Sequence, residues 1–219
     1  MITASLATIP AREPFLKMVV DSLLPQVDLL YVQLNGYDSV PECLDYDNIV
    51  ARLTTNEMGD ANKFMNVDIV DSFFFTCDDD LIYPPDYTQT LINKLDEYGP
   101  VIVTCHGRVF PKGPHESYYA SKIITCHCLS DVPMDCLVHV GGTGVMAFHT
   151  DTIDIRYEDF KEPNMADIWL AKQAYEQYVP IICIEHREGW IKALPVKDTI
   201  WDNYSTRDEV QTEAINSFL

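Results

Sequence analysis

The amino-acid sequence predicts a single α/β domain with a mostly parallel central sheet flanked by helices. Short apolar runs that are typical of buried strands alternate with stretches of helical periodicity through the first half of the chain. The chain has 219 residues, of which 47% are hydrophobic and 22% are charged. It is therefore long enough to bury a core without disulfides or a structural metal.

The first half of the chain supplies most of this alternation. Predicted strands cover residues 2–9, 29–34, 48–54 and 70–77, and predicted helices cover residues 13–24, 62–70 and 84–98. Pro25 ends the first helix, and the pair Asn35-Gly36 closes the second strand. The run at 70–77 contains three consecutive phenylalanines, which is typical of a strand buried on both faces of a sheet.

The second half is less regular. Residues 101–105 predict a strand, and residues 106–140, which are rich in His, Tyr and Pro, predict mixed strands and loops. A glycine-rich stretch at 141–144 leads into a predicted strand at 145–148. Residues 166–178 predict a helix and residues 181–184 a strand, while the polar residues 193–219 predict a C-terminal arm or lid.

The charge balance restricts the class of partner. Fifteen Lys and Arg residues stand against 34 Asp and Glu residues, so the formal net charge is −19. Such a field repels polyanions, which disfavours non-specific binding to nucleic acid or to an anionic membrane. A bound divalent cation would be attracted by this negative field.

The cysteines, the apolar stretches and the first residues of the chain predict its cellular compartment. No stretch reaches the roughly 18 apolar residues of a membrane span, and the first residues do not have the pattern of a signal peptide. We therefore expect a cytoplasmic protein whose seven cysteines are reduced. The cluster Cys126-His127-Cys128, followed by Cys136 and His139, suggests zinc, but the absence of a CxxC pair disfavours it.

The strongest chemical signal is the triplet Asp78-Asp79-Asp80 directly after the phenylalanine-rich strand. Three adjacent carboxylates repel one another unless a cation or hydrogen-bond donors compensate them. In an open α/β sheet the carboxyl ends of the strands are also where ligands bind. Hard divalent ions are commonly held by carboxylates together with water and phosphate oxygens. The alternative is an ordinary acidic loop in which Asp86 caps the next helix.

Residues 75–87, which contain this triplet, resemble the DxD segment of GT-A-fold glycosyltransferases, particularly family-2-like enzymes of bacterial or phage type. Further segments resemble the same family in the same order, namely residues 4–12, 22–26, 32–36, 59–64, 166–170 and 185–190. The resemblance implies one GT-A (Rossmann-like) domain over residues 1–192. Residues 1–100 would form its nucleotide-sugar-binding half, and residues 101–192 its acceptor and catalytic half.

The resemblance also implies an activity, the metal-dependent transfer of a sugar from a nucleotide-sugar donor to a hydroxyl group. The first guess for the donor is a UDP-sugar. The acceptor would be a glycan, a protein or another molecule with a hydroxyl group. The resemblance places Mn²⁺ or Mg²⁺ on Asp78, Asp80 and His186, with Asp80 as the direct ligand. Asp167 would be the general base of an inverting reaction, with Glu162 in reserve. The implied donor-binding residues are Thr8, Pro10, Arg12, Asn35, Lys63, Asp78, Asp79 and Gly142.

Other interpretations of the same residues stay open at this stage. Asp167 also suits a helix amino terminus, Lys63 a solvated helix position, and His186 an ordinary core or surface histidine. The chain could be a nucleotidyltransferase of related fold, although residues 7–12 lack the glycine such enzymes carry after the first strand. It could also be a non-catalytic sugar- or metal-binding protein.

Overall fold

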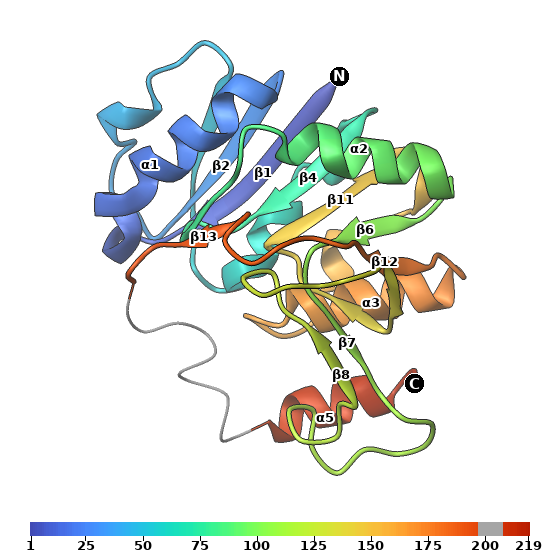
Figure 1. The fold of residues 1–219 in the computed structure, drawn as a ribbon. Coiled ribbons are helices and arrows are strands. Elements are labelled where there is room, and N and C mark those ends of the chain that lie inside the picture. The colour runs from blue at the N-terminus through green and yellow to red at the C-terminus, as the bar shows by residue number, and fades with distance from the viewer. Residues whose placement is uncertain (197–207) are drawn as a thin grey trace.

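The computed structural model of the chain describes residues 1–196 and 208–219 and contains an eight-stranded central sheet flanked by helices (Figure 1). The strand order is β3-β2-β1-β4-β11-β6-β12-β9. The strands are β1 (Ile2–Thr8), β2 (Leu29–Asn35), β3 (Ile49–Thr54), β4 (Phe73–Cys77), β6 (Ile102–Thr104), β9 (Cys136–Val138), β11 (Val145–His149) and β12 (Ile181–Cys183). The predicted α/β class is confirmed.

Six strands of this sheet run in one direction, and β11 and β9 run against them. Because β11 is antiparallel to β4, its first residue, Val145, pairs with the last residue of β4, Cys77. The glycine-rich stretch before β11 therefore meets the acidic triplet that follows β4. The topology of the sheet brings these two sequence signals together at its carboxyl edge.

Helices cover both faces of the sheet. The helices α1 (Glu13–Leu23) and α2 (Tyr87–Tyr98) pack on one face, in a core cluster that includes Phe75 of β4. On the other face α3 (Ala166–Glu176) and α5 (Glu209–Asn216) pack with Phe74. Adjacent phenylalanines point to opposite faces because side chains alternate along a strand. This explains the continuous apolar run that the sequence shows at β4.

Two smaller sheets complete the domain. One contains β10 (Val140–Gly141), β7 (Gly107–Val109) and β8 (Ile124–Cys126), and the other contains β13 (Lys192–Ala193) and β5 (Leu81–Ile82). Within the predicted C-terminal arm, the backbone N–H of Leu194 donates to the carbonyl of Asp80 at 2.8 Å. The helix α5 packs against α3, and residues 197–207 of the arm lie outside the described residues.

The predicted helix at residues 62–70 is wrong. The segment instead forms two short 3₁₀ helices, Gly59–Phe64 and Val67–Ile69. The side-chain amide of Asn62 donates to the Asn35 side chain and to the Thr55 carbonyl, each within 2.9 Å, and these bonds tie the first turn to the sheet. Other 3₁₀ turns are Pro10–Arg12, Leu24–Gln26, Glu42–Leu44, Thr150–Thr152 and Tyr157–Asp159. Local side-chain bonds of this kind compete with a continuous α-helix.

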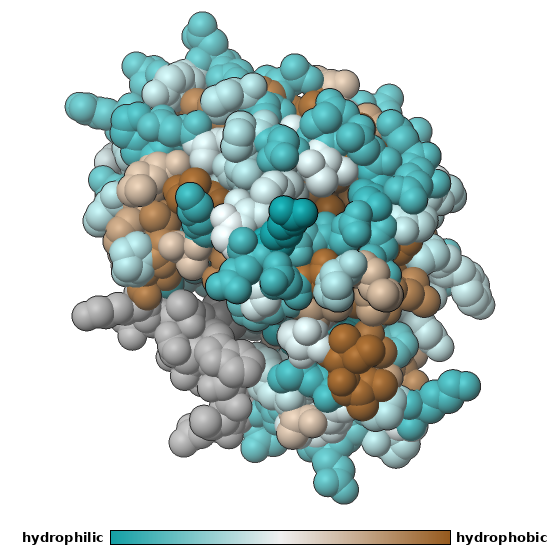
Figure 2. Space-filling model, in the orientation of Figure 1, coloured by the Kyte–Doolittle hydropathy of each residue, from teal (hydrophilic) through white to brown (hydrophobic). Residues whose placement is uncertain are grey.

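The visible surface of the domain is largely hydrophilic (Figure 2). On the face seen in Figure 1, hydrophilic side chains cover most of the surface and hydrophobic ones gather in separate patches (Figure 2). Among the described residues, no helix combines the length and the apolar character that a membrane span requires.

Candidate functional site

A cavity of about 510 Å³ opens at the carboxyl ends of β1, β2 and β4. The chain leaves β1 toward β2 on one side and later enters β4 on the other, so β1 and β4 flank the switch point of the sheet. Ligands of open α/β sheets bind in this crevice. Residues of both halves line it: Ala7, Thr8, Ile9, Arg12, Asn35, Asn56, Gly59, Asp60, Lys63, Asp78, Asp79, Asp80, Arg108, Tyr118, Tyr119, Thr143, Asn164, Met165, Asp167, Ile168 and Gln211.

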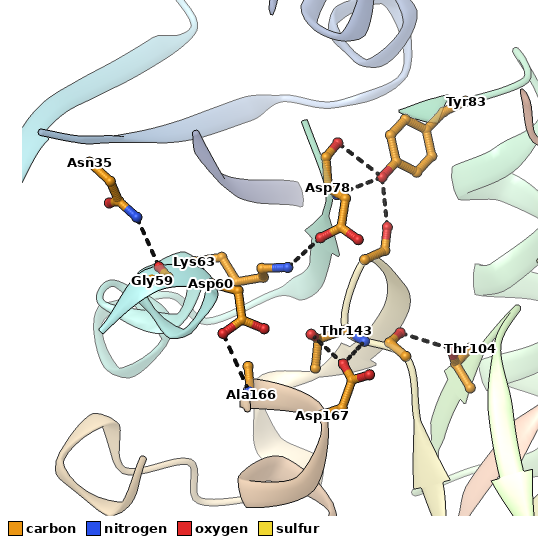
Figure 3. A network of polar contacts seen from close by, with 12 residues as sticks. Asn35, Gly59, Asp60, Lys63, Asp78, Tyr83, Thr104, Thr143, Ala166 and Asp167 are labelled. Atoms are coloured by element: carbon orange, nitrogen blue, oxygen red, sulfur yellow. Dashed lines mark hydrogen bonds and ion pairs between the residues drawn. The ribbon is translucent and has the colours of Figure 1, made fainter. Parts of the chain in front are cut away.

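Asp78 is held in place from three sides (Figure 3). Its carboxylate accepts a hydrogen bond from the Lys63 ammonium at 2.5 Å, and its backbone N–H donates to the Tyr83 hydroxyl at 2.7 Å. The same hydroxyl donates to the Gly144 carbonyl at 2.6 Å. A Cβ on Gly144 would lie 1.8 Å from an Asp78 carboxylate oxygen, so only glycine leaves room for this carboxylate.

Asp79 and Asp80 continue the acidic edge. Burial, together with the neighbouring charges of Asp78 and Asp79, raises the pKa of Asp80 to about 7. Burial likewise raises the pKa of Asp79. Carboxyls of this kind favour any cation that restores charge balance when they ionise. The cavity therefore has an acidic edge on which burial and mutual repulsion oppose ionisation.

Lys63 and Asp60 form a second charged layer beneath the triplet. Lys63 is only 2% exposed, and although burial opposes its charge, the negative charges of Asp78 and Asp60 raise its pKa overall. Burial raises the pKa of Asp60 to about 7, against the lowering effect of Lys63. The Asp60 carboxylate accepts from the backbone N–H of Ala166, the first residue of α3, at 3.4 Å. Lys63 is thus part of the site and not a solvated lysine.

Asp167 faces the triplet from the other side of the cavity (Figure 3). One of its oxygens accepts from the backbone N–H and the hydroxyl of Thr143, at 2.7 and 2.8 Å. Its other oxygen lies 3.6 Å from the guanidinium of Arg108, which itself donates to the Tyr118 hydroxyl at 2.9 Å. Thr143 therefore sets the orientation of a carboxylate whose second oxygen remains on the cavity side, near Arg108.

The Asn35 side chain lines the cavity but is committed to the protein. Its amide group donates to the Gly59 carbonyl at 2.9 Å and to the Asn56 side chain at 3.2 Å. Its oxygen accepts from Thr54 and Asn62, both at 2.8 Å. With donors and acceptor occupied, Asn35 organises the loop that borders the cavity, and no free edge is left for a nucleobase.

The C-terminal helix α5 supplies Gln211 to the cavity lining, and the residue before it holds a loop of the cavity wall. The Asp208 carboxylate, just before α5, accepts from the Ser117 hydroxyl at 2.6 Å and from the Tyr119 backbone N–H at 2.8 Å. The Arg108 guanidinium lies over the rings of Tyr118 and Tyr119, at 5.3 and 6.0 Å from their centroids. The end of the predicted arm therefore positions two tyrosines at the cavity wall.

The structure brings most of the sequence-predicted residues together. Eight line the cavity: Thr8, Arg12, Asn35, Lys63, Asp78, Asp79, Asp80 and Asp167. Pro10, Gly142 and His186 do not. Pro10 begins the turn Pro10–Arg12, and the missing side chain of Gly142 leaves room for His106, whose Cβ would be 2.8 Å from an added Cβ. The reserve base Glu162 is exposed and is not among the lining residues.

His186 differs most from its predicted place. It is 8% exposed, and its ring nitrogens lie 2.8 Å from the Ile184 carbonyl and 3.3 Å from the His127 carbonyl. Its backbone pairs with Val132. These contacts commit both ring nitrogens to backbone carbonyls, and His186 is not among the residues that line the cavity.

Sequence reasoning missed several lining residues. Asp60 lies inside the motif at residues 59–64 but was given no role, and that motif was the signal that would have found it. Thr143 likewise lies within the glycine-rich stretch. Arg108, Tyr118 and Tyr119 lie in the irregular region 106–140, where no local pattern marks them.

No known protein family and no curated protein matches the chain. Among solved structures 127 chains match its fold. One is TarS of S. aureus, a family-2 glycosyltransferase crystallised as residues 1–349 with UDP-GlcNAc. The TM-score is 0.57 and the identity 12%, over 91% of this chain. The chain spans 60% of the length of that TarS chain. At this identity the likeness shows a glycosyltransferase fold.

Proposed function

We propose that the chain is a metal-dependent glycosyltransferase that takes its sugar from a nucleotide-sugar donor. The observation that carries the proposal is the pairing of two carboxylate groups across one cavity at the switch point of a glycosyltransferase fold. Asp78 and Asp80 lie on one side, and Asp167, oriented by Thr143, lies on the other. A cation-dependent diphosphate site facing a fixed base is what this transfer needs.

The donor would bind along the carboxyl edge of the sheet. Mn²⁺ or Mg²⁺ fits the oxygen donors of Asp78 and Asp80, and when bound it would neutralise charge on the leaving diphosphate. Thr8 and Arg12, at the end of β1 and in the turn after it, border the same cavity and are placed to contact the nucleoside diphosphate. The UDP-GlcNAc bound to TarS supports a UDP-sugar as the first donor to test.

The acceptor half would supply the base. In the proposed reaction the Asp167 oxygen that lies near Arg108 takes the proton from an acceptor hydroxyl of a glycan, a protein or another molecule. The acceptor oxygen then forms its bond to the anomeric carbon on the face opposite the departing diphosphate, which gives inversion. Arg108, 3.6 Å from Asp167, and its neighbour Tyr118 would border the acceptor. A positioned general base of this kind contributes roughly 10²–10⁴-fold to a rate.

The test measures donor binding and turnover separately. UDP-GlcNAc with Mn²⁺ should raise the melting temperature of the chain, and neither alone should match that effect, because a ligand that binds only the folded state stabilises it. Asp80→Asn should abolish the metal-dependent shift. Asp167→Asn should keep the shift and lower donor turnover by about 10²-fold or more.

Asp96→Asn is the matched control, because Asp96 is an exposed carboxylate on α2 that does not line the cavity. It should behave as the wild type in both measurements. A panel of UDP-, GDP-, TDP- and CMP-sugars that gives no Mn²⁺-dependent shift would refute the proposed donor class. An unchanged turnover in Asp167→Asn would refute the proposed base.

A further inference from the structure

A cluster of nitrogen and sulfur side chains lies outside the acidic cavity. Potential ligand atoms of His106, His127 and Cys128 lie within 4.8 Å of one another. The two imidazole rings meet edge to face, with centroids 5.0 Å apart. His106 comes from the link between β6 and β7, and His127 and Cys128 follow β8. Residues from two separate segments of the chain thus converge on one point.

The buried histidine of this cluster has an unused ring nitrogen. Nε2 of His106 is buried and has no hydrogen-bond partner among residues 1–196 and 208–219. Buried polar atoms in folded proteins nearly always have a partner, so this nitrogen needs an explanation. Burial, together with the charge of Arg108, lowers the pKa of His106 well below its ordinary value. The imidazole is therefore neutral, which is the form that binds a metal ion.

The backbone around the cluster is held in place. The Gly142 N–H donates to the His106 carbonyl at 2.8 Å, and the His106 N–H donates to the Thr104 hydroxyl at 3.2 Å. His186, whose ring nitrogen contacts the His127 carbonyl at 3.3 Å, supports the segment that carries the other two side chains. The histidine that the sequence placed at the acidic triplet thus supports this cluster.

We propose that His106, His127 and Cys128 bind a Zn²⁺-type ion at a second metal site. A four-coordinate ion with bonds of about 2.0–2.3 Å brings its ligand atoms to roughly 3.3–3.8 Å from one another. The three ligand atoms, all within 4.8 Å of one another, lie close to this spacing, and His127 is the exposed member of the cluster.

Two nitrogens and one sulfur select a different ion from the carboxylates of the cavity. Imidazole and thiolate suit zinc and similar transition metals, whereas Mn²⁺ and Mg²⁺ prefer oxygen. Burial raises the pKa of the Cys128 thiol to about 12, and the charge of Asp78 acts in the same direction. Metal binding at Cys128 therefore releases the thiol proton to solvent as the sulfur–metal bond forms. The fourth position is left to water.

Such an ion would join the segment after β8 to the link before β7. The Gly142 N–H donates to the His106 carbonyl, and the next residue, Thr143, orients Asp167, so one peptide unit links the site to the contact that orients the proposed base. The inference does not depend on the proposed transferase activity, because it concerns a separate set of ligands.

Cobalt titration of the metal-free full chain tests the proposal. Co²⁺ should bind with the intense visible bands of four-coordinate cobalt and a thiolate-to-cobalt charge-transfer band. Cys128→Ser should remove the charge-transfer band, and His127→Ala, at an exposed position that the fold tolerates, should weaken binding about tenfold or more. Asp80→Asn should keep the band, which separates this site from the cavity.

Cys136→Ser is the matched control, because the Cys136 thiol lies outside the cluster and contacts the Leu137 carbonyl at 3.5 Å. It should retain the charge-transfer band. The proposal is overturned if the wild-type chain shows no such band, if the band survives in Cys128→Ser, or if His127→Ala binds Co²⁺ as tightly as the wild type. Loss of the band in Cys136→Ser would equally overturn it, because another thiol would then be the ligand.

Discussion

Asp60→Asn should make the stability of the protein less dependent on pH. Asp60 lies in a layer with Lys63, Asp78 and Asp167, and its pKa is raised from the ordinary value of 3.8 to about 7, chiefly by burial. Asparagine has nearly the same shape, and its side-chain oxygen can still accept from the Ala166 N–H. The substitution therefore removes the titration and retains the contact.

The sign and size follow from the two pKa values. The folded state holds the Asp60 proton more tightly than the unfolded state. The proton therefore stabilises the folded state fully below about pH 3.8, and this stabilisation is lost as the pH rises through 7. With one pKa unit equal to about 1.4 kcal/mol, this carboxyl lowers the free energy of unfolding by about 2–3 kcal/mol between pH 5 and pH 8. The pKa of Asp80 is also raised to about 7, so its ionisation lowers the free energy of unfolding over the same pH range.

The assay is urea unfolding at pH 5 and at pH 8. The wild type should be less stable at pH 8, and Asp60→Asn should recover about 2–3 kcal/mol of that difference with an unchanged dependence on urea concentration. Asp96→Asn, exposed on α2, should leave the difference as it is. The reasoning is wrong if Asp60→Asn and the wild type lose the same stability between the two pH values.

Three further substitutions probe how Asp78 is held. Gly144→Ala should abolish Mn²⁺-dependent donor binding in a thermal-shift assay, since the added Cβ would lie 1.8 Å from a carboxylate oxygen of Asp78; a normal shift would contradict this. Tyr83→Phe should lower the free energy of unfolding by about 1–3 kcal/mol in urea, because two buried hydrogen bonds lose their hydroxyl. Lys63→Met should also destabilise the protein, by about 1–3 kcal/mol at pH 8, and Mn²⁺ should recover part of the loss; destabilisation that is independent of Mn²⁺ would contradict the charge argument.

Local patterns predicted the parts of the site that one segment encodes. The apolar run of β4 and the acidic triplet after it are adjacent in the chain, so the strand end and its carboxylates follow from residues 70–80 alone. Asp167 sits in the first turn of α3, which helical periodicity located. The parallel sheet then places the ends of β1 and β4 at one edge, which brings Thr8 near the triplet.

Contacts between distant segments could not be predicted in the same way. The bond between Asn35 and Gly59 spans 24 residues, and that between the Tyr83 hydroxyl and Gly144 spans 61. The separation of Asp208 from Ser117 is 91 residues. Such pairs depend on how strands order and how loops pack, and a single sequence carries no periodic signal for either.

By itself the sequence determined the α/β class, the acidic edge and eight of the residues that line the cavity, because strand and helix periodicity and the residues that follow a strand are local properties. Only the tertiary structure decided which side chains are available there. Hydrogen bonding with four neighbours commits Asn35, and backbone pairing with Val132 and a contact with the His127 carbonyl hold His186, which does not line the cavity. Burial and long-range contact arise when the chain packs, so availability is a property of the whole fold.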